Sequence, residues 1–354
     1  MKDIENKHVE AEVSDIFQRL ILQIEPEKRL SEKREHSVRE RLSKHKVWLD
    51  SNGQDGVRFQ ARNEDFTGID FSRKNLRKSE FRSCILDYCN FYGADLGDAA
   101  TFWKCSIKKS LVIQVNLDKS KFFECEIENT NFRSSKFLSA TVTGTFSPSS
   151  EDSLSNNDFS GCTFKDSIFN NFNFFSSKIE GATLDGVYWN ECNLSFLDFT
   201  NTNINSSLNM HRCKSIYIKL SGMLIEGSSL VECDLTNAEF EASLANGTDF
   251  SRSNLTRTSF RNAGLAKSRF NMTLGNNMKF YGADINNSEM RLSSFTEANF
   301  YNCKLYESDL SGSDLLSALI NDTTNRNLTN FSGCIWTNGK RCTADSIGVC
   351  YEED

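Results

Sequence analysis

A large apolar side chain returns at every fifth residue through most of this chain. One series runs through positions 66, 71, 76, 81, 86, 91 and 96, and the longest runs at multiples of five from Leu220 to Ile320, with only Ala245 and Gly275 small. A helix repeats every 3.6 residues and a two-sided strand every two, so neither gives this period. A fixed short period instead predicts a solenoid, in which each repeat buries its apolar face against the next.

Each five-residue repeat has two inward positions of unequal size. A small residue stands two places before the large one, and Asp or Asn often stands directly before it, as in Ala94, Asp95 and Leu96. The two positions after the large residue are mostly polar. We therefore expect a narrow interior, filled by one small and one large side chain per repeat, inside a polar wall. Gly275 stands in a large position, which predicts a local void or an inward shift.

The repeat resembles that of the bacterial pentapeptide-repeat family, whose unit reads A(D/N)Lxx. The segments 94–98 (ADLGD), 283–287 (ADINN) and 298–302 (ANFYN) match this unit, and the resemblance extends over about residues 62–335. It implies an all-β solenoid, a right-handed quadrilateral β-helix with four repeats per coil and about 12 coils in all. Residues 20 apart would then stack on one face, as Phe240 would on Phe260.

Residues 1–57 and 336–354 lie outside the repeat, and we expect them to cover the two ends of the β-helix at 58–335. Apolar residues at helical spacing predict a helix over 6–24, and a strongly charged helix follows to about Leu49. An open solenoid end exposes unpaired strand edges, so both ends need a cap. The expected structural cap residues are Trp48, Trp336, Cys342 and Cys350.

The 12 cysteines invite a metal or disulfide interpretation, but the register of the repeat favours packing. Cys84, Cys89 and most of the others stand two residues before a large one, where Cys acts as a compact apolar residue. No CxxC or Cys/His spacing typical of a zinc site occurs, so we expect no metal. Many buried free thiols favour a reducing compartment. We expect Cys342 and Cys350 to be reduced as well, with a disulfide between them as the alternative.

No constellation of catalytic residues can be assembled from the sequence. The chain has four histidines, three of them before the repeat begins, and no Ser/His/Asp or Cys/His arrangement has support from spacing. Neither a GxGxxG turn after a strand nor a GxxxxGK[ST] loop is present. The many carboxylates fall in outward positions. We therefore expect a protein that is not an enzyme and that binds no cofactor.

The charge is unevenly distributed along the chain. Residues 147–354 carry 16 basic and 25 acidic side chains, whereas residues 58–146 carry 14 basic and 11 acidic ones. An acidic second half argues against direct binding of nucleic acid through phosphate contacts. No apolar run is long enough to span a membrane, and the N-terminus has no apolar signal core. These features favour a cytoplasmic protein, and the family resemblance implies a bacterial one, with secretion by a specialised system left open.

The five-residue period fails at two places, and loops on a regular scaffold are where binding residues concentrate. The period lapses at 143–153, which has the composition of a loop, and falters at 206–219, a basic and aromatic stretch within the acidic half. A single inserted residue between Leu96 and Phe102 fits a bulge. The candidate partner-binding residues are Pro148, Glu151, Asp152, His211, Arg212, Lys214 and Tyr217.

A long regular surface without catalytic chemistry predicts a non-enzymatic scaffold that binds a protein partner through its walls or loops. The family resemblance implies one alternative, a DNA-imitating protein that interacts with a type II topoisomerase and protects it from quinolones or toxins. The modest acidity of residues 147–354 is weak for imitating a duplex. A second alternative is a secreted bacterial effector. The oligomeric state stays open, a dimer being one option.

Overall fold

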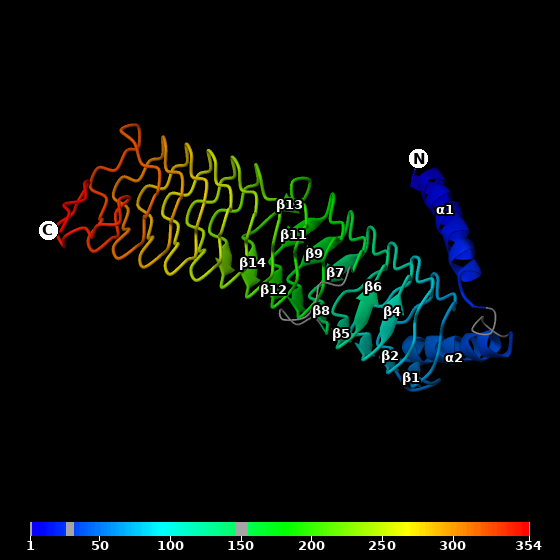
Figure 1. The fold of residues 1–354 in the computed structure, drawn as a ribbon. Helices are drawn as coiled ribbons and strands as arrows, with labels where there is room; N and C mark the ends of the chain where they lie inside the picture. Colours follow the sequence, from blue (N-terminus) through cyan, green and yellow to red (C-terminus); the bar gives the residue numbers. More distant parts are fainter. Residues whose placement is uncertain (1, 26–31, 146–154, 354) are drawn as a thin grey trace. The chain divides into compact units, whose positions relative to one another are not determined.

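The computed structural model describes residues 2–25, 32–145 and 155–353. The chain divides into two compact units, the first formed by Met1–Phe146 with Glu151–Thr183 and the second by Ser147–Ser150 with Leu184–Asp354. Within each unit, successive coils of a β-helix follow one another in sequence order (Figure 1). The predicted all-β solenoid with a helical N-terminal region is confirmed.

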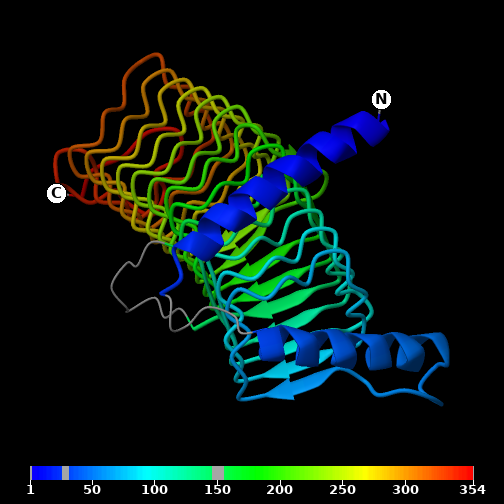
Figure 2. The ribbon, with the colours of Figure 1, turned by 90° about the vertical axis from the view of Figure 1, so that its right-hand side faces the viewer.

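The first unit begins with two helices, α1 (Lys2–Leu22) and α2 (Glu32–Asp50). Helix α1 lies against a side wall of the coils, where its Val13 and Phe17 form a buried cluster with Tyr92, Leu111 and Ile113. Helix α2 lies beside the first coil (Figure 2). Both helices confirm the predicted helical segments, and Pro26, which could separate them, falls outside the described residues.

The strands are short because each flat side of the coil holds only one repeat before the chain turns. Among the described residues, ten lie wholly in the first unit: β1 (Gln60–Arg62), β2 (Glu80–Arg82), β3 (Thr101–Trp103), β4 (Ser106–Lys108), β5 (Lys121–Phe123), β6 (Glu126–Glu128), β7 (Lys136–Leu138), β8 (Thr141–Thr143), β9 (Thr163–Lys165) and β10 (Ile168–Asn170). The division between the units falls within β11 (Thr183–Asp185). The second unit contains β12 (Tyr188–Asn190), β13 (Asn203–Ile204), β14 (Asn209–His211) and β15 (Ser229–Val231).

Strands on one side of the coil pair in parallel, one strand per coil. In the first unit this ladder has six levels among the described residues, at Gln60, Glu80, Thr101, Lys121, Thr141 and Ile168. In the second unit it has eight, at Tyr188, Asn209, Ser229, Asp249, Arg269, Glu289, Asp309 and Asn330. These levels exceed the 12 coils expected from the uninterrupted repeats. The coils at Gln60, Asn209 and Asn330 contain positions that do not follow the uninterrupted five-residue repeat, so they were not counted in that expectation.

The small inward position has a hydrogen-bonding role as well as a packing role. Ser253 Oγ donates to the Leu230 carbonyl in the preceding coil at 2.7 Å, and Thr258 Oγ1 donates in the same way to Leu235 at 2.8 Å. The acid or amide before the large residue accepts a bond from the backbone two residues on, as Asp249 does from the Ser251 N–H at 2.9 Å. These bonds satisfy backbone groups inside the coil and at its corners.

The large inward side chains stack from coil to coil. Phe240 and Phe260 lie in parallel with ring centroids 4.8 Å apart, and Phe280 and Phe300 do so at 5.0 Å. Such pairs add to the free energy gained by burial alone. The predicted stacking of residues 20 apart is therefore confirmed.

The expected loop at 206–219 is instead a regular part of the β-helix. Strand β14 pairs in parallel with both β12 and β15, and Met210, Cys213 and Ile218 are buried. The five-residue series continues backwards from Leu220 through Ser215 to Met210, and only the spacing to Ile204 contains an additional residue. Because Ser215 stands in a position that a large apolar residue normally occupies, the sequence did not reveal that the five-residue register continues there. Most of the other expected loop, 143–153, lies outside the described residues.

Within the part of the chain that the structure describes, neither helix has the length and apolar character needed to cross a membrane.

Candidate functional site

The basic stretch of the second unit does not form one cluster. Arg212 and Tyr217 occupy consecutive corners of a coil, where both have a positive φ, near 52° and 57°. Lys214 lies on the side between these corners, paired in the ladder with Asp234, and His211 is exposed at the end of β14. The structure therefore places Arg212 and Tyr217 on different edges of the unit.

Arg212 belongs to a ladder of alternating charges along its corner. Its Nε lies 2.9 Å from Glu232, and a second guanidinium nitrogen lies 3.7 Å from Glu191. Arg252 approaches the same Glu232 at 3.4 Å. The hydrogen bond from Arg212 holds the pKa of the Glu232 carboxyl below its usual value. Because these carboxylates engage Arg212, its charge is less available to a partner than the sequence suggested.

Tyr217 forms an exposed aromatic pair with Phe196. The two rings are stacked with centroids 5.2 Å apart, and the side chains remain 46% and 49% exposed. Phe196 and Tyr217 stand at the same corner of neighbouring coils, two residues after a large position. Phe196 was not among the predicted binding residues, although an aromatic side chain in an outward position was the signal that could have identified it.

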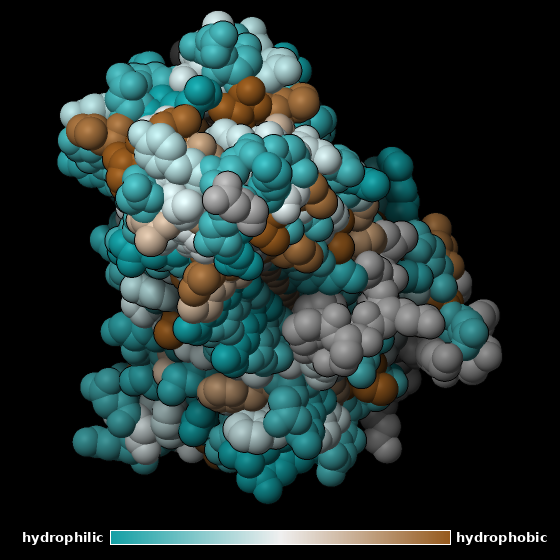
Figure 3. Space-filling model, turned by 60° about the vertical axis from the view of Figure 1, so that its left-hand side comes forward, coloured by the Kyte–Doolittle hydropathy of each residue, from teal (hydrophilic) through white to brown (hydrophobic). Residues whose placement is uncertain are grey.

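Pro148, Glu151 and Asp152, the other candidate partner-binding residues, lie outside the described residues. Exposed apolar side chains also occur elsewhere, some of them in neighbouring coils, as Leu224 and Leu244 are. On the face shown in Figure 3 they form brown patches within a largely polar surface. Trp103 is also exposed and contacts Phe123 with ring centroids 5.2 Å apart, but Phe123 is only partly exposed. The pair of Phe196 and Tyr217 differs because both of its rings are exposed.

The N-terminal end of the β-helix is covered by α2, whose His45 is fully buried against the first coil. Its Nδ1 accepts a hydrogen bond from the Phe59 N–H at 3.0 Å, while Nε2 lies 3.1 Å from the Arg77 carbonyl. Trp48 stacks on the outer side of this imidazole at 5.8 Å. Arg41 lies 4.6 Å above the Phe59 ring and forms an ion pair with Glu64, which occupies a small inward position. Helix α2 thus accommodates the irregular first coil.

The C-terminal tail turns back on the last coil. Ile347 and Arg341 form antiparallel bridges to Asn330 and Ile335, and Trp336 packs edge-on against Phe331 at 5.1 Å. Cys342 and Cys350 form a disulfide, with their Cα atoms 5.1 Å apart, a separation suited to the bond. The expectation of two reduced thiols was wrong, because the turn of the tail brings these residues together.

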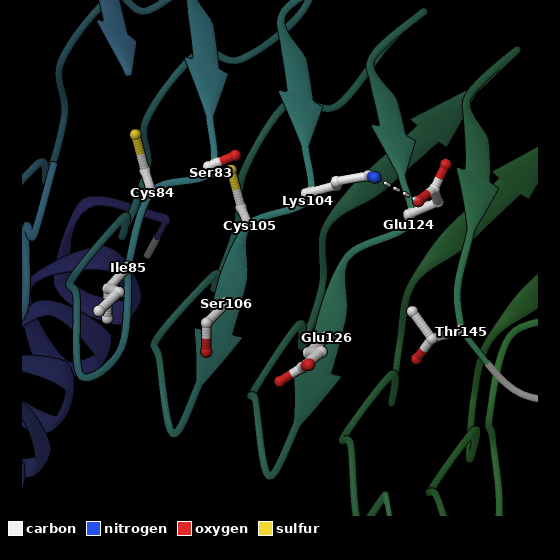
Figure 4. Close-up of a pocket in the computed structure, with 9 residues that line it drawn as sticks. All are labelled: Ser83, Cys84, Ile85, Lys104, Cys105, Ser106, Glu124, Glu126 and Thr145. Carbon is white, nitrogen blue, oxygen red and sulfur yellow. Dashed lines mark ion pairs between the residues drawn. The ribbon is translucent and has the colours of Figure 1, made fainter. Parts of the chain in front are cut away.

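A groove of about 360 Å³ crosses four coils of the first unit. Figure 4 shows Ser83, Cys84 and Ile85 from one coil and Lys104, Cys105 and Ser106 from the next, followed by Glu124, Glu126 and Thr145. Lys104 and Glu124 form an ion pair across it at 3.2 Å. A hydrogen bond with Cys125, together with burial, raises the pKa of Cys105 to about 12. At neutral pH that thiol stays protonated, so the groove has no activated Cys105 nucleophile.

Two family models match the two units separately. The model described as pentapeptide repeats (8 copies) matches residues 65–99, and the model described as pentapeptide repeat region matches residues 223–300. Both matches fall on segments that the structure forms into four-sided coils. In residues 65–99 and 223–300 the chain is therefore made of pentapeptide repeats.

Solved structures include similar pentapeptide-repeat proteins. QnrB1, described as a plasmid-mediated fluoroquinolone resistance protein, is 17% identical over 60% of this chain and 90% of its own, with a TM-score of 0.23. HetL, from the cyanobacterium Nostoc and involved in heterocyst differentiation regulation, is 14% identical over 83% and 96%, also with a TM-score of 0.23. No curated protein matches the chain. At these values neither structure supports an argument about function.

Among the described residues of this pentapeptide-repeat protein, no three or more His, Cys, Asp or Glu side chains are arranged to hold a metal ion. The cysteines in the small inward positions pack against backbone instead. Cys303, for example, donates its thiol hydrogen to the Phe280 carbonyl at 2.6 Å, and burial raises the pKa of this thiol to about 12.

Proposed function

We propose that this protein is a non-enzymatic scaffold that binds a protein partner through the outer surface of its second unit. The observation that supports this function is the stacked and half-exposed pair of Phe196 and Tyr217. Aromatic side chains leave apolar area in water, and protein interfaces are enriched in them because they bury large areas with little loss of conformational freedom. The partner surface would cover both rings and remove this area from water.

The neighbourhood of the pair resembles the rim of an interface. On the side of the coil that follows the corner, Lys219 approaches Asp198 at 3.9 Å, and Asp198 accepts hydrogen bonds from Thr200. An apolar centre with charged groups around it is the arrangement in which a few central residues supply most of the binding energy. The ten buried free thiols fit a reducing compartment, whereas the disulfide between Cys342 and Cys350 fits an oxidising one. The proposed interaction requires neither.

Affinity capture with a matched control tests the proposal. The double variant Phe196→Ser, Tyr217→Ser removes both rings, and Tyr188→Ser removes a different exposed aromatic side chain of the same unit, 54% accessible. We expect partners captured by the natural chain and by Tyr188→Ser to be lost from the double variant. Far-ultraviolet circular dichroism checks that the double variant is folded. The same captured proteins in all three samples would reject the role of this pair.

A second candidate is a type II topoisomerase as the partner, bound through imitation of DNA. The acidic surface needed for that role is interrupted, because residues 251–280 contain six basic and no acidic side chains. A duplex carries uninterrupted negative charge along its length. We therefore favour this candidate less than a scaffold that binds through the aromatic pair. A gyrase supercoiling assay with and without ciprofloxacin tests it. Inhibition or protection by the natural chain would favour it, and no effect would remove it.

A further inference from the structure

The charges of the second unit are sorted along the sequence into bands. Residues 221–250 contain six acidic and no basic side chains, and the next thirty residues reverse this with six basic and no acidic ones. The basic side chains are Arg252, Arg257, Arg261, Lys267, Arg269 and Lys279. A coil holds 20 residues here, as the pairing of Ser259 with Lys279 shows. The basic band therefore extends over about one and a half coils.

Two of the six cations are neutralised by the preceding acidic band. Arg252 lies 3.4 Å from Glu232, and Arg269 lies 2.9 Å from Asp249. Within the described parts of the chain, the other four cations have no ion pair. Unpaired surface cations keep their full charge for a ligand, since no internal partner must first be displaced.

Three of these four cations lie on one side of the coil, which we call the basic face: Arg257, Arg261 and Lys279. Lys279 follows Glu239 and Ser259 in one ladder of this side. Arg257 stands at the corner before Ser259, with φ near 59°, and Arg261 directly follows the buried Phe260. Lys267 stands at a different corner of the coil, two residues after the large position of the next side, and is not part of the basic face.

Arg261 is held in place without losing its hydrogen-bond donors. Its guanidinium carbon lies 5.7 Å from the ring centroid of Tyr281 in the following coil. The acidic neighbour in the preceding coil, Glu241, accepts a hydrogen bond from Ser259 at 2.8 Å. A guanidinium that rests on an aromatic ring keeps its N–H groups directed outward, ready to bind a carboxylate in bidentate fashion.

The basic face is bounded along the axis by acidic residues. Glu239 and Glu241 precede it by one coil, and Glu297 follows at the corner one coil beyond Asn277. With coils about 5 Å apart, the positive surface is roughly 5–10 Å long. A long polyanion would meet these carboxylates, whereas a run of a few acidic residues would not. The face thus fits a short acidic segment better than nucleic acid.

We propose that the basic face binds a short acidic segment of a protein partner; this inference rests on the proposed scaffold function and names the partner's charge. The aromatic pair belongs to the same edge. The corners of Tyr217, Asn237 and Arg257 are joined from coil to coil by backbone hydrogen bonds of 3.1 Å and 3.0 Å, from Tyr217 to Thr236 and from Asn237 to Thr256. A partner could therefore contact the rings and the basic face together.

Fluorescence anisotropy with a labelled eight-residue peptide, in which three consecutive Glu residues of about 10 Å extended length are flanked by neutral residues, tests the basic face directly. We expect saturable binding to the natural chain, and a Kd about tenfold higher for Arg261→Glu or Lys279→Glu, because each reverses a charge at the contact. The matched control is Lys267→Glu, which makes the same change of charge at a different corner and should leave the Kd within about twofold. Equal weakening in Lys267→Glu, or no saturable binding by the natural chain, would overturn the proposal.

Oligothymidine of the same charge distinguishes an acidic protein segment from a general polyanion. Binding of oligothymidine as tight as that of the peptide would also overturn the proposal. The peptide assay does not depend on Phe196 or Tyr217, so the two proposals fail separately. Loss of peptide binding with partner capture intact rejects the basic face alone, and the opposite result rejects the role of the aromatic pair.

Discussion

Met278 fills the space that the missing side chain of Gly275 leaves inside the β-helix. A Cβ atom on Gly275 would overlap the Met278 sulfur and would lie 3.1 Å from the Phe295 ring. Met278 occupies a small inward position and is fully buried. The expectation of a void or an inward shift at Gly275 was therefore wrong. A flexible thioether in the small position compensates for the absent large residue, because an empty space would forfeit dispersion contacts.

This exchange of sizes predicts strong coupling between the two positions. Met278→Ala should lower the free energy of unfolding by about 2–5 kcal/mol, because it opens a cavity. Gly275→Leu alone should cost about 1–3 kcal/mol through overpacking. The double variant should recover most of both losses, since Leu then occupies the vacated space. Urea denaturation of the four proteins checks this, and additive losses would contradict the compensation.

Two buried serines should respond in opposite ways to the same substitution. Ser253 donates to the Leu230 carbonyl and accepts from the Cys233 N–H at 2.9 Å. Ser215 is equally buried, but its hydroxyl has no hydrogen-bond partner in the described structure. Ser253→Ala should therefore cost about 1–3 kcal/mol, whereas Ser215→Ala should be neutral or stabilising. Equal losses of unfolding free energy in the two variants would argue against this assignment of hydrogen bonds.

Acid should destabilise the contact between α2 and the first coil through His45. Burial lowers the pKa of this imidazole below its ordinary value of 6.5, and protonation of Nδ1 would break the hydrogen bond from the Phe59 N–H. The unfolded chain binds the proton more readily, so the contribution to stability is complete above pH 6.5 and declines as the pH falls below it.

The control for this pH dependence is His45→Gln, which cannot titrate. Thermal unfolding of both proteins between pH 7.5 and 5 should show a steeper decline for the natural chain. The difference between the two curves removes the contribution of the carboxylates, which titrate in both proteins. Parallel curves would mean that His45 is not the group responsible.

The disulfide between Cys342 and Cys350 should stabilise the C-terminal tail. Closing a loop of this length contributes about 2–3 kcal/mol in the chain-entropy account. A reductant should therefore lower the unfolding temperature of the natural chain, and should not affect the double variant Cys342→Ser, Cys350→Ser. The ten other cysteines are present in both proteins and serve as an internal control. An equal effect of reductant on both proteins would count against a stabilising disulfide.

The repeated interior could be predicted from the sequence because each repeat specifies its own inward positions. Phe240 and Phe260 are large, apolar and separated by one coil, so their stacking follows from the period alone. The place of α1 could not be predicted in this way. Tyr92, Leu111 and Ile113 are apolar residues in outward positions. This pattern indicates that another segment covers the wall there, but it does not identify that segment.

The candidate binding residues were harder to predict for a different reason. A break in the period at 206–219 looked like a loop, although the chain continues there as a coil with Ser215 in a large position. Arg212 is exposed, but its ion pairs with Glu191 and Glu232 come from coils about 20 residues away in either direction. Only the stacking of coils brings these charges together.

The antiparallel tail has a consequence for growth at the end of the second unit. Every pairing within the coils is parallel, whereas the bridges from Asn330 to Ile347 and from Ile335 to Arg341 are antiparallel. A bare last coil would present a parallel edge on which the first coil of another molecule could add, and repetition of that step would give a fibre. The reversed direction of the tail removes this template and so limits head-to-tail polymerisation.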